Sequence, residues 1–260
     1  MNVLTLLVKA RNAGQLKQID GLLKAEFENL DVDCKVLGAP VNQWVQVSLS
    51  GEDEVIASNY INKEMGTCPI NAKKVEKHTA VKGYITKVDT AKNELTVDVG
   101  IFEPKTTVAV IPLAVLQAQL ADGKKFSLKE IAKAYGLHEN LSVEVKIAEV
   151  VSPEEGDLQA ELSSTQIEKL FVWRQSLLDR LIVIGASSME VDEVIQRTRL
   201  NRDIIVVERL GLFEYALTCK LGTDAAGLIP RMGRYMRNAV FVVFSPRRIT
   251  ELIGEMPLTL

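Results

Sequence analysis

The sequence predicts an α+β protein built from several domains. The chain has 260 residues, enough for two domains or three small ones. Its composition, 47% hydrophobic and 25% charged, is that of an ordinary globular protein. Alternating apolar segments, typical of strands, are interspersed with segments of helical periodicity. We expect an N-terminal unit over residues 1–76, a β-barrel over residues 77–163 and a C-terminal α/β domain over residues 164–260.

The first 70 residues have the order β-α-β-β-α. Apolar spacing predicts a helix over Ala13–Glu28. A second helix is expected to begin at a capping box, Ser50–Asp53, and to end at Gly66. The strands are short alternating segments: Val3–Lys9, Val32–Val36 and Trp44–Leu49. This order is most of a split βαβ, ferredoxin-like unit, whose fourth strand would be Ile70–Val75 or would be missing.

Residues 81–163 have the pattern of a small five-stranded barrel. The expected strands alternate in polarity: Val81–Val88, Leu95–Gly100, Thr107–Pro112, Leu141–Ile147 and Asp157–Ser163. A helix over Ser127–Gly136, with a capping box at its start, follows the third strand. Five strands with a helix after the third is the order of an oligonucleotide-binding (OB) barrel. A bulge near Gly83 would let Lys82, Tyr84 and Lys87 share the outer face.

A lysine-rich link over residues 71–87 leads into this barrel. Such a run of charge is either a solvated surface or an electrostatic footprint for phosphate.

Three motifs of the barrel segment carry a resemblance. They are Lys-Gly-x-Ile-x-x-Val-Asp at residues 82–89, Val-x-Val-Gly at 97–100, and the pair Val-Glu-Val-Lys-Ile and Asp-Leu-Gln-Ala-Glu-Leu-Ser ending at Ser163. These motifs resemble the OB-type RNA-binding domain first named from a protein of the small ribosomal subunit. The resemblance implies that one barrel face binds single strands through aromatic and basic side chains. The matching positions are Tyr84, Lys87, Phe102 and Lys105.

The segment departs from that pattern on its second and third strands. Thr96, Asp98, Thr106 and Thr107 stand where aromatic residues are expected. Base stacking needs π-faces. Phosphate binding and protein binding therefore remain open beside base binding.

The C-terminal residues predict an α/β domain. Its expected strands include Leu181–Gly185, Asp203–Glu208 and Ala239–Phe244. A helix capped at Ser187–Glu190 separates the first two, which would form a right-handed crossover if they are parallel. The sequences of Leu217–Gly222 and Leu228–Pro230 are similar to those of Leu95–Gly100 and Val110–Pro112 in the barrel. This similarity indicates either a possible second barrel-like element or the independent occurrence of a common strand-turn-strand sequence followed by proline.

The segment from Ala225 to Thr250 contains five arginines and no acidic residue. The arginines are Arg231, Arg234, Arg237, Arg247 and Arg248. A net charge of −3 does not by itself favour nucleic acid. Because charge is concentrated here, we predict the main phosphate-binding patch in this segment and a second one on the barrel at Lys82, Tyr84, Lys87, Phe102 and Lys105.

A second resemblance rests on two sequence motifs in the C-terminal part of the chain. Val-Glu-Arg-Leu-Gly at 207–211 and Leu-Gly-Thr-Asp-Ala-Ala-Gly-Leu-Ile-Pro at 221–230 are similar to an uncharacterised archaeal family defined as a domain of unknown function. The resemblance implies an archaeal, cytoplasmic setting and supplies no catalytic residues.

Motifs for enzyme chemistry do not occur in the sequence. There is no HExxH, CxxC, GxSxG or Walker pattern, and there are only two histidines. Cys34, Cys68 and Cys219 are widely separated, which indicates reduced thiols in a cytoplasm. We therefore expect no catalytic residues, no metal and no cofactor. The apolar runs are far shorter than a membrane span, and the N-terminus reads as a strand instead of a signal peptide.

Two function classes remain. The first is a non-catalytic RNA-binding protein, associated with a ribosome or a transcript, that contacts phosphates through its basic patches. The second is a protein–protein adaptor that docks on a larger translation or transcription complex. An enzyme ranks third, because no carboxylate or thiol group can be placed in a cleft from sequence.

Overall fold

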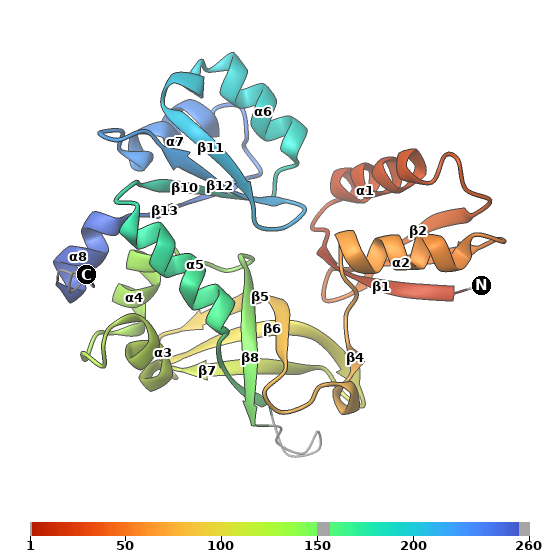
Figure 1. Ribbon diagram of the computed structural model, residues 1–260, viewed down its shortest axis with the longest axis horizontal. Helices are drawn as coiled ribbons and strands as arrows, with labels where there is room; N and C mark the ends of the chain where they lie inside the picture. The colour runs from red at the N-terminus through yellow and green to blue at the C-terminus, as the bar shows by residue number, and fades with distance from the viewer. Residues whose placement is uncertain (1, 150–156, 255–260) are drawn as a thin grey trace. The chain divides into compact units, whose positions relative to one another are not determined.

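A computed structural model describes residues 2–149 and 157–254 (Figure 1). The predicted α+β multidomain class is confirmed. The chain forms two compact units, one of Met1–Lys74 with Gly100–Thr106, the other of Val75–Val99 with Thr107–Leu260. The first unit is built on an N-terminal sheet, and the second contains most of a barrel together with a C-terminal sheet.

The N-terminal sheet has the predicted order of elements. These are β1 (Asn2–Lys9), α1 (Ala13–Glu26), β2 (Asp33–Val41), β3 (Trp44–Ser50) and α2 (Glu54–Glu64). The strands pair antiparallel in the order β1-β3-β2, which is a split βαβ arrangement without its fourth strand. Only an isolated bridge between Leu6 and Thr67 lies where that strand would start. The short β4 (Ile70–Asn71) pairs with Ile101 and Glu103 instead.

The predicted capping box at Ser50–Asp53 is wrong. Asp53 is the N-cap residue of α2, but its side chain makes no hydrogen bond to the helix. Its carboxylate instead accepts a hydrogen bond from the backbone N–H of Asp31, at 2.8 Å. The acidic side chain therefore joins two loops of the unit instead of stabilising the helix start. Gly66 follows the helix with a φ of 76°, the left-handed conformation expected there.

The middle of the chain forms a closed barrel of five strands. These are β5 (Ala80–Asp89), β6 (Glu94–Glu103), β7 (Thr107–Pro112), β8 (Ser142–Glu149) and β9 (Leu158–Leu162). Their order is β6-β5-β8-β9-β7, and the pairing of β6 with β7 closes the sheet. Two helices, α3 (Leu113–Leu120) and α4 (Leu128–Tyr135), lie between β7 and β8. This is the OB arrangement predicted from the strand order.

Two local predictions for the barrel have different outcomes. The capping box of α4 is confirmed, with Ser127 and Glu130 each bonding the other's backbone N–H. The bulge near Gly83 is wrong, because the irregularity lies between Ile85 and Lys87. Gly83 is required for a different, steric reason. A Cβ at this position would lie 2.4 Å from the carbonyl oxygen of Asp98, so only glycine lets β5 and β6 approach this closely.

The C-terminal sheet has four strands and two helices on one face. In chain order the elements are β10 (Arg180–Ile184), α6 (Ser188–Arg197), β11 (Ile204–Arg209), β12 (Glu214–Cys219), α7 (Ala225–Gly233) and β13 (Val240–Phe244). The strand order is β11-β12-β10-β13, and every pairing is antiparallel. β10 and β11 run in the same direction, because both are antiparallel to β12, which lies between them. The two strands of the crossover considered from the sequence are therefore parallel but do not pair with each other. This domain is therefore a complete split βαβ unit, and the N-terminal sheet has the same topology without the counterpart of β13.

The sequence similarity between the barrel and the C-terminal segment does not reflect a structural repeat. Val110–Pro112 belongs to strand β7, whereas Leu228–Pro230 lies within helix α7. Asp224 starts that helix, its side chain accepting a hydrogen bond from the N–H of Ala226 at 2.9 Å. The described C-terminal residues form one open sheet, so the possible second barrel-like element is absent from them.

Aromatic side chains pack the barrel against the C-terminal sheet. Phe244, at the end of β13, is fully buried and lies 5.2 Å from the ring of Trp173 and 6.2 Å from that of Tyr135 (centroid distances). Trp173 belongs to α5 (Ser164–Gln175), and the last helix, α8 (Pro246–Ile253), packs against α4 and α5. Arg174 also donates a hydrogen bond to the carbonyl of Gly254 at 2.8 Å. This shared core explains why the barrel and the C-terminal sheet form one unit.

Candidate nucleic-acid interface

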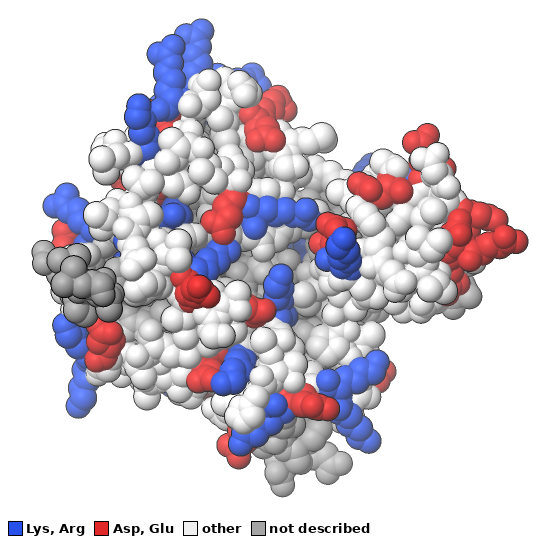
Figure 2. All heavy atoms as spheres, viewed as in Figure 1, with Lys and Arg blue, Asp and Glu red and all other residues white. Residues whose placement is uncertain are grey.

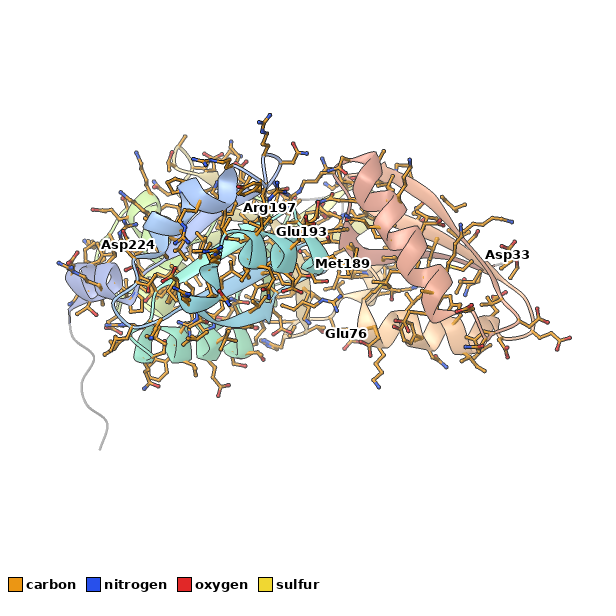
Figure 3. The ribbon with its side chains drawn as sticks, turned by 90° about the horizontal axis from the view of Figure 1, so that it is seen from above. Asp33, Glu76, Met189, Glu193, Arg197 and Asp224 are labelled. Carbon is orange, nitrogen blue, oxygen red and sulfur yellow. The ribbon has the colours of Figure 1, made fainter. Side chains whose placement is uncertain are left out.

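The candidate interface lies where two helices of the C-terminal domain end. Helices α6 and α7 cover the same face of the sheet, because residues such as Val191, Val194, Leu228 and Met232 share one buried cluster with Leu217 of β12. In Figure 3, Met189, Glu193 and Arg197 follow one another along α6. The last of them is the final residue of α6. This packing brings the end of α6 near α7, although two strands, β11 and β12, separate the two helices along the chain.

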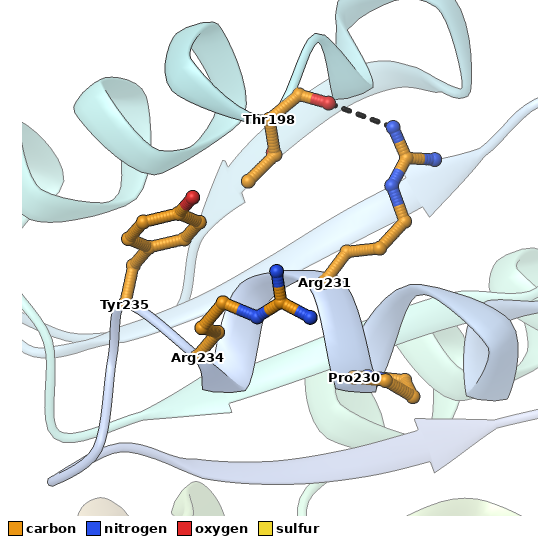
Figure 4. A pocket seen from close by; sticks show the side chains of 5 residues that line it. All are labelled: Thr198, Pro230, Arg231, Arg234 and Tyr235. Atoms are coloured by element: carbon orange, nitrogen blue, oxygen red, sulfur yellow. Dashed lines mark hydrogen bonds between the residues drawn. The ribbon is translucent and has the colours of Figure 1, made fainter.

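An open pocket of about 230 Å³ lies at this place (Figure 4). It is lined by Thr198, Pro230, Arg231, Arg234 and Tyr235. Thr198 is the C-cap of α6, and the other residues belong to α7 or directly follow it. The pocket therefore unites two of the arginines predicted from the sequence with a tyrosine that was not predicted.

Arg231 is held in place by two partners. Its guanidinium donates hydrogen bonds to the carbonyl oxygen of Thr198 at 2.7 Å and to a carboxylate oxygen of Asp203 at 3.1 Å. The first contact satisfies a carbonyl at the end of α6, where a positive charge is favourable. Because the side chain is still half exposed, its remaining N–H groups can reach a ligand.

Arg234 and Arg237 are exposed and differ from Arg231 in their surroundings. Neither has a carboxylate partner within residues 2–149 and 157–254. In the described structure their charges are therefore not neutralised by an ion pair.

Tyr235 is 42% exposed at the edge of the pocket. The guanidinium carbon of Arg197 lies 4.5 Å from the centre of its ring, a cation–π contact between α6 and the segment after α7. The contact fixes the orientation of an aromatic ring that solvent can reach.

Three arginines of this region were missed by the sequence interpretation. Arg197, Arg199 and Arg202 occur within six residues and are all exposed. Their close spacing is a signal, but only the packing of α6 against α7 shows that this run lies beside Arg231 and Arg234. Figure 2 shows basic side chains gathered over the upper part of the C-terminal domain on the face in view.

Arg247 and Arg248 do not line the pocket. Both lie on α8, which packs against α4 and α5. Arg247 pairs with Glu251 one turn further along the helix, at 2.9 Å. The five predicted arginines therefore separate into Arg231 and Arg234, which line the pocket, Arg237, which follows them along the chain, and a pair on α8.

The site residues predicted on the barrel also differ in their exposure and in the compact unit to which they belong. Tyr84 is only 3% exposed, and its hydroxyl lies 3.6 Å from where a Cβ on Gly211 would be, so the turn between β11 and β12 lies over it. Its ring is thus unavailable to stack on a base, contrary to what the resemblance implied. Lys82 and Lys87 are exposed on β5, whereas Phe102, half-buried, and Lys105, exposed, belong to the first compact unit.

Lys87 pairs with Asp89 at 2.6 Å. This hydrogen bond and charge raise the pKa of Lys87 and lower the pKa of Asp89. The lysine keeps its charge, but that charge is already shared with a neighbouring carboxylate. Its charge is therefore less available to an anion than the charges of Arg234 and Arg237, which have no such partner in the described structure.

The structure shows no arrangement for metal or thiol chemistry in the residues it describes. No group of three His, Cys, Asp or Glu side chains there could hold a metal ion. Cys34, Cys68 and Cys219 are buried, and burial raises the pKa of Cys34 and of Cys219 to about 11. Among the described helices, none has the length and apolar character needed to cross a membrane.

Comparison with known families matches nearly the whole chain. The DUF2110 N-terminal domain matches residues 4–70, the DUF2110 central domain residues 75–174, and the DUF2110 C-terminal domain residues 178–244. No curated protein matches the chain. The central match covers the barrel with α5, and the two outer matches cover the two split βαβ sheets.

Proposed function

The chain belongs to the DUF2110 family, and we propose that it is a non-catalytic, cytoplasmic RNA-binding protein of an archaeal cell, associated with a ribosome or a transcript. One observation carries this proposal. Arg231, Arg234 and an exposed Tyr235 line a single pocket, with Arg197 stacked on the tyrosine. Basic groups beside an accessible ring are the combination that binds single-stranded nucleic acids.

The chemistry of arginine supports phosphate as the ligand. A guanidinium presents its N–H donors in a planar fork that matches two phosphate oxygens. Arg231 is already held by Thr198 and Asp203, so less side-chain freedom is lost when it binds. Arg234, which also lines the pocket, carries a charge that a phosphate can neutralise.

The local charge matters more than the net charge of −3. Each phosphate contact releases condensed counterions, so affinity falls as salt rises. Exposed arginines without carboxylate partners contribute most to this effect, because a partner must otherwise be displaced. Arg234 and Arg237 are such residues in the described structure.

The test measures the salt dependence of RNA binding. The full chain is titrated against a labelled single-stranded RNA between about 50 and 200 mM salt, followed by fluorescence anisotropy. The double change Arg234→Gln with Arg237→Gln should make the negative slope of log affinity against log salt shallower by about 1.4, or about 0.7 for each contact. Arg247→Gln is the matched control and should leave the slope unchanged, because Arg247 pairs with Glu251 away from the pocket.

Two results would contradict the proposal. One is the absence of RNA binding by the unaltered chain at low salt. The other is a salt slope that changes equally in the double variant and in the control. That result would show that the arginines at the end of α7 make no particular contribution to RNA binding.

A protein–protein adaptor is the second candidate, favoured by a different observation. Strand β11 ends the C-terminal sheet, and its consecutive residues Ile205, Val206 and Val207 are 53%, 52% and 40% exposed. An apolar edge strand can pair with a strand of another protein. A partner captured after nuclease treatment, and lost on Val206→Lys, would favour this function over RNA binding.

A further inference from the structure

We infer that Tyr235 is a stacking platform for one unpaired nucleobase, so that the pocket selects single-stranded RNA over duplex RNA. This inference rests on the proposed function and adds the class of RNA that the site accepts. It assigns separate tasks to the pocket residues: the arginines hold phosphates and the tyrosine holds a base.

The exposure of Tyr235 is the first observation. Tyr84, Tyr135 and Tyr215 are at most 4% exposed, whereas Tyr235 is 42% exposed. Burial of an aromatic ring is favourable, and a single exposed ring needs no explanation by itself. This ring, however, lies at the edge of a pocket that also contains two guanidinium groups.

The contact with Arg197 is the second observation. The guanidinium carbon lies 4.5 Å from the ring centre and therefore covers one face of the tyrosine. Arg197 does not line the pocket, whereas Tyr235 does. Arg197 can cover only one face of the ring, and the side chain is 42% exposed, so a base can stack on the face that Arg197 leaves uncovered.

The two groups together predict selectivity. Phosphates are present in single strands and in duplexes, so Arg231 and Arg234 alone discriminate weakly between them. In a duplex the bases are paired and stacked on one another, and an aromatic side chain can stack only on an unpaired base. The preference for single strands should therefore depend on Tyr235.

The experiment uses the full chain and three labelled RNA probes of one sequence: the single strand, its duplex, and the single strand with abasic sites. Tyr235→Leu removes the ring but keeps an apolar side chain, and Tyr235→Phe keeps the ring. Stacking on one base contributes about 1–3 kcal/mol, so Tyr235→Leu should weaken single-strand binding about 5- to 150-fold. Duplex affinity, binding to the abasic strand and the salt slope should stay unchanged, and Tyr235→Phe should bind as the unaltered chain does.

Each other outcome overturns the inference in a distinct way. Equal loss of single-strand and duplex binding in Tyr235→Leu would show that the ring only maintains the pocket. Unchanged single-strand binding would show that no base stacks on it, while a normal salt slope would leave the proposed function intact. No RNA binding by the unaltered chain would refute both. Retained duplex affinity also shows that the Tyr235→Leu variant is folded.

Discussion

Replacing Phe244 by alanine is expected to destabilise the second compact unit and leave the first unchanged. Phe244 is fully buried, and its ring contacts Trp173 of α5 and Tyr135 of α4. These contacts join the barrel to the C-terminal sheet. The first unit, which contains the N-terminal sheet, has its own core around Trp44, Ile19 and Leu23.

The size of the effect follows from the cavity that the change leaves. Truncation of a buried phenylalanine to alanine costs about 3–5 kcal/mol. With an m-value of about 2 kcal/mol per molar urea, the unfolding midpoint of the second unit should fall by roughly 2 M. Because the ring touches residues of both the barrel and the C-terminal sheet, the two should lose stability together.

The two tryptophans of the chain report the units separately. Trp44 lies in the first unit and Trp173 in the second. The assay is urea unfolding followed by fluorescence in two backgrounds, Trp44→Phe and Trp173→Phe, each with and without Phe244→Ala. The midpoint seen by Trp173 should shift and that seen by Trp44 should not. An equal shift in both, or no shift at the Trp173 transition, would refute the division of the core described above.

Three further changes test single features. Gly83→Ala should lower the thermal midpoint, at a cost of about 1–3 kcal/mol, because its Cβ would lie 2.4 Å from the carbonyl oxygen of Asp98. Gly227→Ala in α7 is the control and should raise the midpoint, because its Cβ would meet no atom within 4 Å beyond its chain neighbours and the backbone of its own helix. Ser187→Ala should cost about 1 kcal/mol in urea unfolding, because Ser187 caps α6, and an unchanged midpoint would contradict this role. Burial raises the pKa of Cys219 from 9.0 to about 11, so its contribution to the free energy of unfolding is present below pH 9 and is lost as pH rises toward 11. A Cys219→Ala variant should lack that part of the decline, and identical pH profiles of the two proteins would contradict it.

The barrel could be predicted from the sequence because its signal is local. Alternation with a period of two identifies a strand and its buried face without knowledge of its partners. The strand order with the helix at Ser127–Gly136 then suggested the OB arrangement, and the capping box and the end of the helix at Gly136 are as expected. The additional helix α3 was missed because Leu113–Leu120 is apolar except for Gln117 and Gln119 and shows little helical periodicity.

The pairing of the C-terminal strands could not be predicted in the same way. A buried strand such as β10 has an uninterrupted apolar pattern that is compatible with parallel and with antiparallel neighbours. Of its two neighbours, β12 follows after helix α6 and strand β11, and β13 follows after a further helix, α7, so the choice is made by tertiary packing. The same limitation explains Tyr84: alternation placed it on the outer barrel face, but the turn that covers that face contains Gly211, far along the chain.

The candidate site shows how one topology can have different chemistry at the two ends of the chain. In the N-terminal sheet, the region where α1 ends is occupied by an edge-to-face pair, Phe27 with Tyr60 of α2, at a centroid distance of 5.6 Å. In the C-terminal domain, the end of α6 carries Arg197, which contacts the tyrosine that follows α7. The helices have the same order in the two sheets. The end of α1 carries an apolar residue, Phe27, whereas the end of α6 carries a positively charged and exposed one, Arg197. The proposed RNA site therefore depends on the side chains at the helix ends, because the topology is present twice and the pocket that Arg231 and Arg234 line belongs to the C-terminal copy.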